Sequence, residues 1–102
     1  MSEPTGATST AGWTFLTNHA HVLLCIVQDS EVRLRDVAAR VGITERAVQR
    51  IVTDLEGAGY LTVSKEGRRN RYQVHYELPL RHPIERHRNV KELIALVVES
   101  RG

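Results

Sequence analysis

Cysteine is nearly absent from this sequence, and long apolar runs are absent altogether. The single cysteine, Cys25, excludes a disulfide within the chain and favours a reducing compartment such as the cytoplasm. Every apolar run falls short of the roughly 18 residues that a membrane span requires. The N-terminus lacks a basic segment followed by an apolar stretch, so we expect no secretory signal. These absences predict a soluble cytoplasmic protein.

The length and composition indicate one small domain. The chain has 102 residues, of which 41% are hydrophobic and 25% charged, as in an ordinary globular protein. Residues 1–12 are small and polar and include Pro4, Gly6 and Gly12, so we expect a disordered N-terminal tail. At this size the hydrophobic core is modest, and a partner chain would add stability.

Two amphipathic helices are predicted after the tail. Apolar residues spaced i, i+3, i+4, i+7 define one face of the first helix, which Thr17 or Asn18 caps. That face comprises Ala20, Leu23, Leu24 and Val27. A shorter second helix runs over residues 35–41 and ends at Gly42, because glycine readily adopts the left-handed conformation that ends helices. The short alternating pattern of residues 31–34 indicates either a brief strand or a connection that leads directly into this second helix.

A third helix is predicted after Thr44, a typical N-cap residue, and ends near Gly57 and Gly59. Its apolar face repeats the same spacing with Val48, Ile51, Val52 and Leu55. Its opposite face is polar and comprises Glu45, Arg46, Gln49, Arg50 and Thr53. One face can therefore anchor this helix while the other contacts a partner.

Beyond the third helix the hydrophobic period changes to two, which is typical of β-strands. The apolar members of the two alternating runs are Leu61 and Val63, then Tyr72, Val74 and Tyr76. Residues 66–70 separate the runs, and Gly67 and Asn70 suit a turn. The pattern predicts a β-hairpin with a basic tip.

The C-terminal part predicts a final helix and a homodimer. Residues 78–83 predict a loop, and Pro83 suits the first position of a helix. Residues 93–98 are apolar at every position, and a helix that is apolar all round needs cover on all sides. We expect a second copy of the chain to supply that cover. The expected interface residues are Trp13, Phe15, Val90, Leu93, Ile94, Leu96 and Val97.

The segment Leu34–Leu61, LRDVAARVGITERAVQRIVTDLEGAGYL, together with the arginine-rich hairpin, resembles bacterial transcription regulators of the MarR and ArsR types. The motif residues are Ala38, Gly42, Val48, Ile51 and the exit Leu55-Glu56…Gly59-Tyr60-Leu61. The resemblance implies an α+β, mainly helical, winged helix-turn-helix fold. Residues 13–80 would form the DNA-binding domain with a two-stranded wing, and residues 81–102 a C-terminal dimerisation helix. It also implies a regulator that binds double-stranded DNA and is not an enzyme.

Side chains of the third helix and the hairpin match the chemistry of duplex DNA. Arginine and glutamine donors fit guanine and adenine edges in the major groove, while hydroxyl and basic groups contact phosphates. The predicted DNA-binding residues are Arg35, Thr44, Arg46, Gln49, Arg50, Thr53, Lys65, Arg68, Arg69 and Arg71.

The distribution of charge supports this assignment, although the net charge of the whole chain is only +2. Residues 33–75 hold nine Lys or Arg and five Asp or Glu, a net charge of +4, whereas the rest of the chain carries −2. The basic excess therefore lies on the elements that would contact DNA.

Other chemistries have weaker support in the sequence. His21 and Cys25 are spaced i, i+4 and could share a metal, but paired cysteines are missing, so we expect no metal and no cofactor. No residue pattern supplies a catalytic site. The tyrosines suit core positions better than stacking on bases. A protein-interaction adaptor remains an alternative, as does a repressor that responds to a ligand or metal bound between dimer helices.

Overall fold

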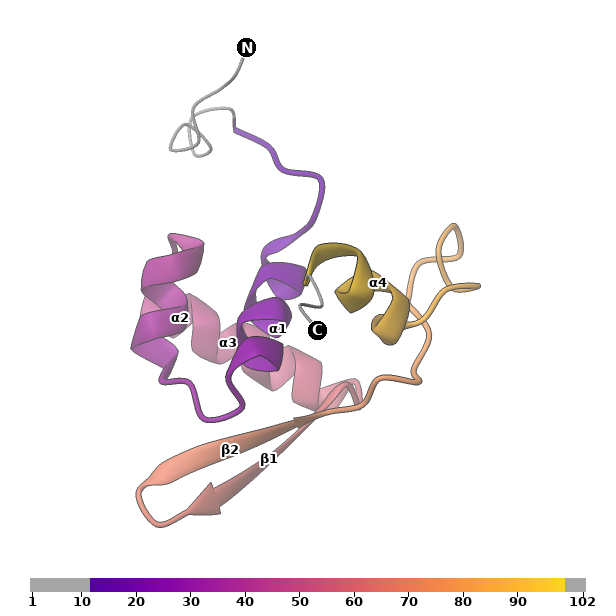
Figure 1. Cartoon of the computed structure of the whole chain (residues 1–102). Helices are drawn as coiled ribbons and strands as arrows, with labels where there is room; N and C mark the ends of the chain where they lie inside the picture. The colour runs from indigo at the N-terminus through magenta and orange to yellow at the C-terminus, as the bar shows by residue number, and fades with distance from the viewer. Residues whose placement is uncertain (1–11, 99–102) are drawn as a thin grey trace.

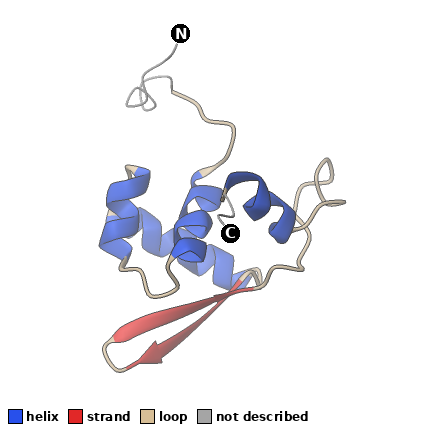
Figure 2. Cartoon of the chain, viewed as in Figure 1, coloured by secondary structure: helices blue, strands red, loops and turns tan. Residues whose placement is uncertain are grey.

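The computed structural model describes residues 12–98, which form four helices and one two-stranded antiparallel sheet (Figure 1; Figure 2). In chain order the elements are α1 (Asn18–Gln28), α2 (Leu34–Val41), α3 (Glu45–Gly57), β1 (Leu61–Glu66), β2 (Arg69–Val74) and α4 (Val90–Val97). This order confirms the predicted α+β fold of three helices, a hairpin wing and a final helix. The predicted tail, except for Gly12, lies outside the described residues. None of the described helices is long and apolar enough to cross a membrane.

Helix α1 occupies the centre of the core. It begins at the predicted cap, where the Thr17 hydroxyl accepts a hydrogen bond from the Ala20 N–H. Five consecutive residues, 22–26, are buried, and Val22 and Ile26 are the least exposed among them. The amphipathic stripe predicted from spacing therefore identified the helix but not its most buried positions. Burial of consecutive residues means that α1 is covered on several sides (Figure 1).

Helices α2 and α3 form the helix-turn-helix; α2 begins at Leu34, one residue before the predicted start, while the predicted end at Gly42 and the predicted cap at Thr44 are confirmed. Gly42 follows α2 with φ of 87°, a left-handed conformation that disfavours a side chain, and its N–H donates to the Ala38 carbonyl. Thr44 then caps α3, since its hydroxyl accepts from the Ala47 N–H at 3.0 Å. The tight turn and the cap together fix where α3 begins.

Strands β1 and β2 pair antiparallel, with Leu61 opposite Val74 and Val63 opposite Tyr72. These four side chains face the core, which confirms the predicted alternation. The turn is tighter than residues 66–70 suggested, because Glu66 pairs with Arg69 and only two residues form the loop. Gly67, the first of them, has φ of 66°, as a type II′ turn requires.

The hairpin also contacts the segment between α1 and α2. The Tyr72 N–H donates to the Ser30 carbonyl at 3.0 Å, and the Tyr72 side chain is buried. Residues 31–34 form no strand, so of the two predictions for this segment the lead into α2 is the correct one. Tyr76 was predicted in the second strand, but β2 ends at Val74 and Tyr76 lies in a turn.

Two expectations about the final helix, its start and the residues that it exposes, are wrong. Helix α4 begins at Val90, not at Pro83, because Asn89 and Glu92 form a reciprocal capping box there. Val90 and Ile94, which were expected at a dimer interface, are 1% and 8% exposed within the single chain. They belong to the same buried cluster as α1, so the chain itself covers this face of α4.

The capping box makes α4 sensitive to acid. The pKa of Glu92 is lowered from its usual 4.5, chiefly because its carboxylate accepts the Asn89 N–H and also because Arg88 donates to it. A carboxyl with a lowered folded-state pKa stabilises the fold above its unfolded value, and that contribution is lost as pH falls below 4.5. We expect the protection factors of amide hydrogens in α4, which are corrected for the intrinsic exchange rate at each pH, to fall over this acidic range. Glu92→Gln, which keeps a capping side chain without the titration, should remove that fall, and equal pH profiles of the two protection factors would contradict the assignment.

Candidate nucleic-acid interface

The solvent face of α3 presents a continuous set of hydrogen-bond donors. Arg46, Gln49 and Arg50 are exposed, and with Thr44 and Ala47 they line a shallow hollow of about 410 Å³. The opposite face of α3 is buried through Val48, Ile51, Val52 and Leu55. The helix is therefore anchored along one side while guanidinium and amide groups on the other side remain accessible.

The two threonines of the predicted site differ in what their hydroxyls can do. Thr44 accepts the Ala47 N–H, so the proton of its own hydroxyl remains available to a phosphate oxygen. Thr53 instead donates its hydroxyl to the Gln49 carbonyl at 3.1 Å. A phosphate oxygen accepts hydrogen bonds, so this geometry favours Thr44 over Thr53 as a phosphate contact.

The wing and the start of α3 border one hollow of about 390 Å³. Its lining comes from the segment before α2, the first turn of α3 and the hairpin, and comprises Glu31, Val32, Arg33, Leu34, Glu45, Arg68, Arg69, Asn70 and Tyr72. Arg68 and Arg69 of the predicted site thus share a hollow with Glu45 at the start of α3, whereas Arg46, Gln49 and Arg50 line a separate hollow. Arg33, which the sequence did not single out, lies on this hollow, and Arg35 is exposed nearby on α2.

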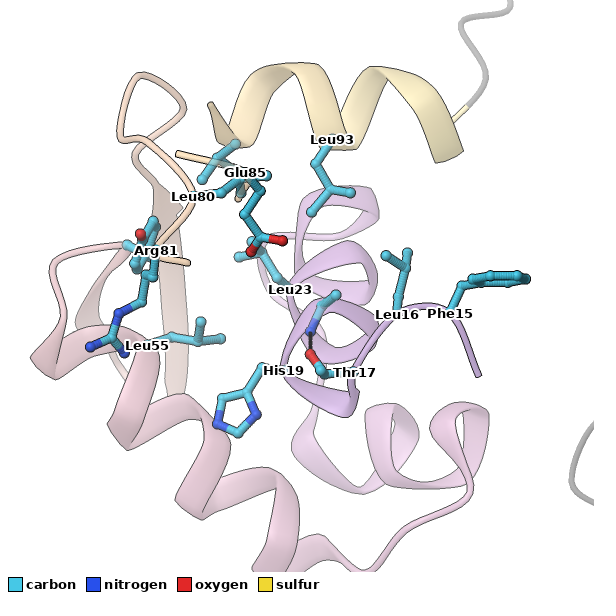
Figure 3. Close-up of a pocket in the computed structure, with 13 residues that line it drawn as sticks. Phe15, Leu16, Thr17, His19, Leu23, Leu55, Leu80, Arg81, Glu85 and Leu93 are labelled. Atoms are coloured by element: carbon cyan, nitrogen blue, oxygen red, sulfur yellow. Dashed lines mark hydrogen bonds between the residues drawn. The ribbon is translucent and has the colours of Figure 1, made fainter. Parts of the chain in front are cut away.

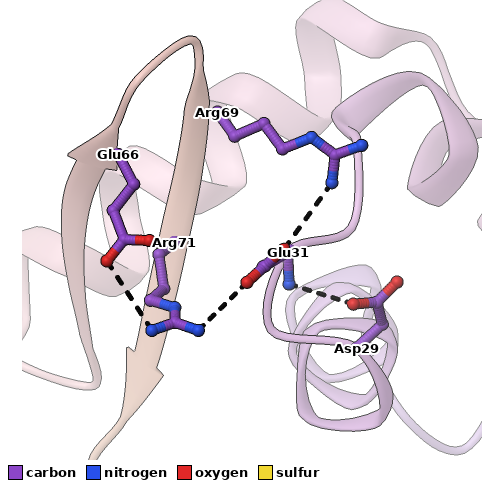
Figure 4. Close-up of polar contacts among 5 residues, drawn as sticks. All are labelled: Asp29, Glu31, Glu66, Arg69 and Arg71. Atoms are coloured by element: carbon purple, nitrogen blue, oxygen red, sulfur yellow. Dashed lines mark hydrogen bonds and ion pairs between the residues drawn. The ribbon is translucent and has the colours of Figure 1, made fainter.

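The basic residues of the wing fall into two groups. Lys65 and Arg68 are exposed, and among residues 12–98 neither forms an ion pair. Arg71 contacts Glu31 at 3.0 Å and Glu66 at 3.6 Å, and Arg69 contacts Glu31 at 3.7 Å (Figure 4). Glu31 precedes the basic region 33–75, so the charge count of that region overstates the positive charge available on the wing.

A second kind of surface surrounds the start of α1 and the end of α4. Trp13 and Phe15 pack edge to face with ring centroids 5.1 Å apart, yet Phe15 is 92% exposed. Leu96 on α4 is 80% exposed, Val97 is also exposed, and Leu93 is half-buried. Beside them lies an apolar pocket of about 290 Å³ between α1, the loop at Leu80 and α4 (Figure 3). The expected interface residues other than Val90 and Ile94 therefore remain available to a partner.

The histidines and the cysteine form no metal centre in the described part of the chain. No group of three or more His, Cys, Asp or Glu within residues 12–98 has the geometry to hold a metal ion. Cys25 is buried, and His21 Nδ1 lies 3.2 Å from the Asn18 side-chain oxygen, which accepts the hydrogen bond. His19 lies 2.9 Å from Asp54, which links α1 to α3 at the surface.

Comparison with known proteins agrees with this geometry. Residues 17–62 match the family model described as winged helix-turn-helix DNA-binding, a span that includes α1, α2, α3 and the first two residues of β1. The solved structure of the PcaV transcriptional regulator from Streptomyces coelicolor, in complex with its natural ligand, is similar with a TM-score of 0.53. The identity is 20%, and the alignment covers 74% of this chain and 68% of that chain, so the likeness concerns the fold. No curated protein sequence matches the chain.

Proposed function

We propose that the chain is a sequence-specific transcription regulator that acts as a homodimer. It carries a winged helix-turn-helix DNA-binding domain, and proteins of this family are not enzymes. The observation that supports this most directly is the exposed set Arg46, Gln49 and Arg50 on an anchored α3, whose first residue, Glu45, shares a hollow with Arg68 of the hairpin tip. Its compartment would be the cytoplasm, since a free buried thiol suits reducing conditions.

In this proposal α3 enters the major groove. A groove about 12 Å wide admits one helix, and the edges of all four base pairs differ there. Arg46 and Arg50 offer paired donors that fit guanine, and the amide of Gln49 fits adenine. Thr44, at the start of the helix, would contact a phosphate and set the depth of insertion.

The wing would follow the flanking backbone. Lys65 and Arg68 are its cations without an ion pair among residues 12–98, and the hollow that Arg68 shares with Glu45 lies between the tip and the first turn of α3. Contacts to phosphates position a protein without selecting sequence. In this arrangement α3 discriminates between base pairs, and the wing binds the DNA backbone.

Selection of bound sequences from random duplex DNA tests the proposal as a whole. We expect enrichment of one motif with two inverted half-sites, because a two-fold dimer presents two copies of α3. Their centres should lie about 10 base pairs apart, or a multiple of that distance. Failure to enrich any motif at low salt would contradict sequence-specific binding.

Arg68→Ala should weaken binding to all duplexes by a similar factor. If Arg68 contacts one phosphate, its loss should reduce the slope of log affinity against log salt by about 0.9. Fluorescence anisotropy at several salt concentrations measures the slope. Arg86→Ala, an exposed arginine in the loop before α4, is the matched control and should leave the slope unchanged. An unchanged slope for Arg68→Ala would show that the wing tip does not contact DNA.

The exposed apolar surface is the basis for proposing a homodimer. Phe15 protrudes beside the pocket that it lines with Leu93, while Thr14 and Val97 border a neighbouring hollow. Two-fold pairing of such a surface allows the protruding aromatic of each copy to face the hollow of the other. Burial of Trp13, Phe15 and Leu96 would remove their apolar surface from water.

Leu96→Glu should dissociate the dimer without unfolding the chain. Leu96 is 80% exposed, so a carboxylate is tolerated in the monomer, whereas burial against a second copy would leave the charge without a partner. Sedimentation should show a dimer for the wild type and a monomer for the variant. Ile84→Glu, at an exposed apolar residue in the loop before α4 that is not among the expected interface residues, serves as the control and should remain dimeric. A dimeric Leu96→Glu would reject this interface.

A further inference from the structure

Glu31 sits between the helical part of the chain and the wing. Its carboxylate lies 3.0 Å from the Arg71 guanidinium and 3.7 Å from that of Arg69 (Figure 4). The Glu31 N–H donates to the Asp29 carboxylate at 3.0 Å, which holds the backbone of the turn. One acidic side chain thus contacts two of the three arginines of the hairpin.

The wing does not depend on Glu31 for its place in the fold. Tyr72 of β2 is buried in the core, and its N–H donates to the Ser30 carbonyl. Leu61 and Val63 pack in or against the same core from β1. The Glu31 pairs are half-exposed, with side chains 42–51% accessible, and ion pairs of that kind contribute little to stability. The effect of Glu31 is therefore on the charge that the wing offers, and not on its position.

The two arginines differ in their second partner. Arg71 also contacts Glu66 at 3.6 Å, whereas Glu31 is the one carboxylate within ion-pair distance of Arg69 among residues 12–98. Removal of the Glu31 charge would leave Arg71 with a partner and release Arg69. Arg68, one residue before Arg69, has no ion pair in the same range.

We propose that Glu31 limits the affinity of the wing for DNA by pairing with Arg69 and Arg71, so that Arg68 and Lys65 supply the phosphate contacts. Glu31 acts through the charge of these arginines and does not itself contact DNA. The proposal rests on the proposed DNA binding. Because non-specific binding grows with each phosphate contact, pairing of Arg69 and Arg71 with Glu31 would lower the affinity of the chain for duplexes of any sequence.

Glu31→Gln keeps the size of the side chain and removes its charge. With a 30-base-pair duplex of random sequence, we expect the slope of log affinity against log salt to steepen by about 0.9, because Arg69 gains one phosphate contact. At 0.1 M salt this corresponds to about eight-fold tighter binding, if the two proteins bind equally at 1 M. Thermal stability should stay near the wild-type value.

Two controls separate ion pairing from a general gain of positive charge. Glu77→Gln makes the same charge change at an exposed residue that forms no ion pair with the wing, and should leave the slope unchanged. In an Arg69→Ala background, Glu31→Gln should no longer steepen the slope. A wild-type slope for Glu31→Gln, or equal effects of Glu31→Gln and Glu77→Gln, would overturn the role of Glu31 while leaving DNA binding in place. Absence of DNA binding by both the wild type and Glu31→Gln would instead overturn the proposed function.

A second measurement uses the unaltered chain. Side-chain NMR signals of arginine Nε–Hε groups report changes of partner. When DNA is added to the wild type, the Arg68 signal should shift and the Arg69 signal should stay close to its position in the free protein. Equal shifts of both signals would show that DNA displaces Glu31 and would contradict the proposal.

Discussion

Arg50→Ala is expected to weaken binding to the preferred duplex by about 1–3 kcal/mol, a loss of roughly 5- to 150-fold. Arg50 is exposed on the face of α3 that also presents Arg46 and Gln49, and no ion pair engages it among residues 12–98. A guanidinium donates two parallel hydrogen bonds to guanine, and alanine leaves both acceptors of the base without a partner in the complex. Competition binding with duplexes altered at single positions measures the loss.

The specificity of the variant distinguishes a base contact from a phosphate contact. If Arg50 contacts a base, Arg50→Ala should relax discrimination at one position of the motif while binding to random DNA changes less. Arg50→Lys, which keeps the charge without the planar fork, should behave similarly. Arg86→Ala removes the same charge from the loop before α4 and should preserve the preference. Equal losses on preferred and random duplexes would refute a base contact by Arg50.

Ile26→Ala should lower the free energy of unfolding by about 2–5 kcal/mol. Ile26 is 1% exposed in α1, the helix that contacts both α2 and α3. Truncation removes apolar atoms from the core and leaves a cavity that neighbours fill only partly. Because small domains are stable by only about 5–15 kcal/mol, the variant should unfold at a markedly lower urea concentration.

Ile84→Ala is the matched control for this stability prediction. The same atoms are removed, but Ile84 is 78% exposed in the loop before α4. We expect a change within about 0.5 kcal/mol, as for most surface substitutions. Similar urea midpoints for the two variants would contradict the central position of α1 in the core. DNA binding by Ile26→Ala should follow its folded fraction, because no atom of Ile26 faces the candidate interface.

The helices and the hairpin followed from local patterns in the sequence. The spacing of Val48, Ile51, Val52 and Leu55 identified the anchored face of α3, and Thr44 identified its start. These features depend on residues within a few positions of one another, so they are visible without tertiary information. The same reasoning placed Gln49 and Arg50 on the solvent face, where the structure also has them.

The errors concern contacts between distant segments. Val90 and Ile94 were assigned to a second copy of the chain because α4 is apolar on several sides, but they are buried in the same core cluster as α1 within one chain. Pro83 suggested a helix start by its own preference, while the capping box at Asn89 and Glu92 set the actual start. The ion pairs of Arg69 and Arg71 with Glu31, some 40 residues earlier, could not be seen in the sequence, and contact of these two arginines with DNA stays a prediction.

The sequence by itself determined the kind of elements, their order and the polar face of α3, because hydrophobic period, caps and turn residues act over one or two helical turns. The tertiary structure decided which apolar residues of α4 the chain buries and which charges of the wing are neutralised. Both depend on side chains that meet only after the chain has folded. For that reason the positive surface offered to DNA is a property of the packed molecule and not of the basic residues counted along it.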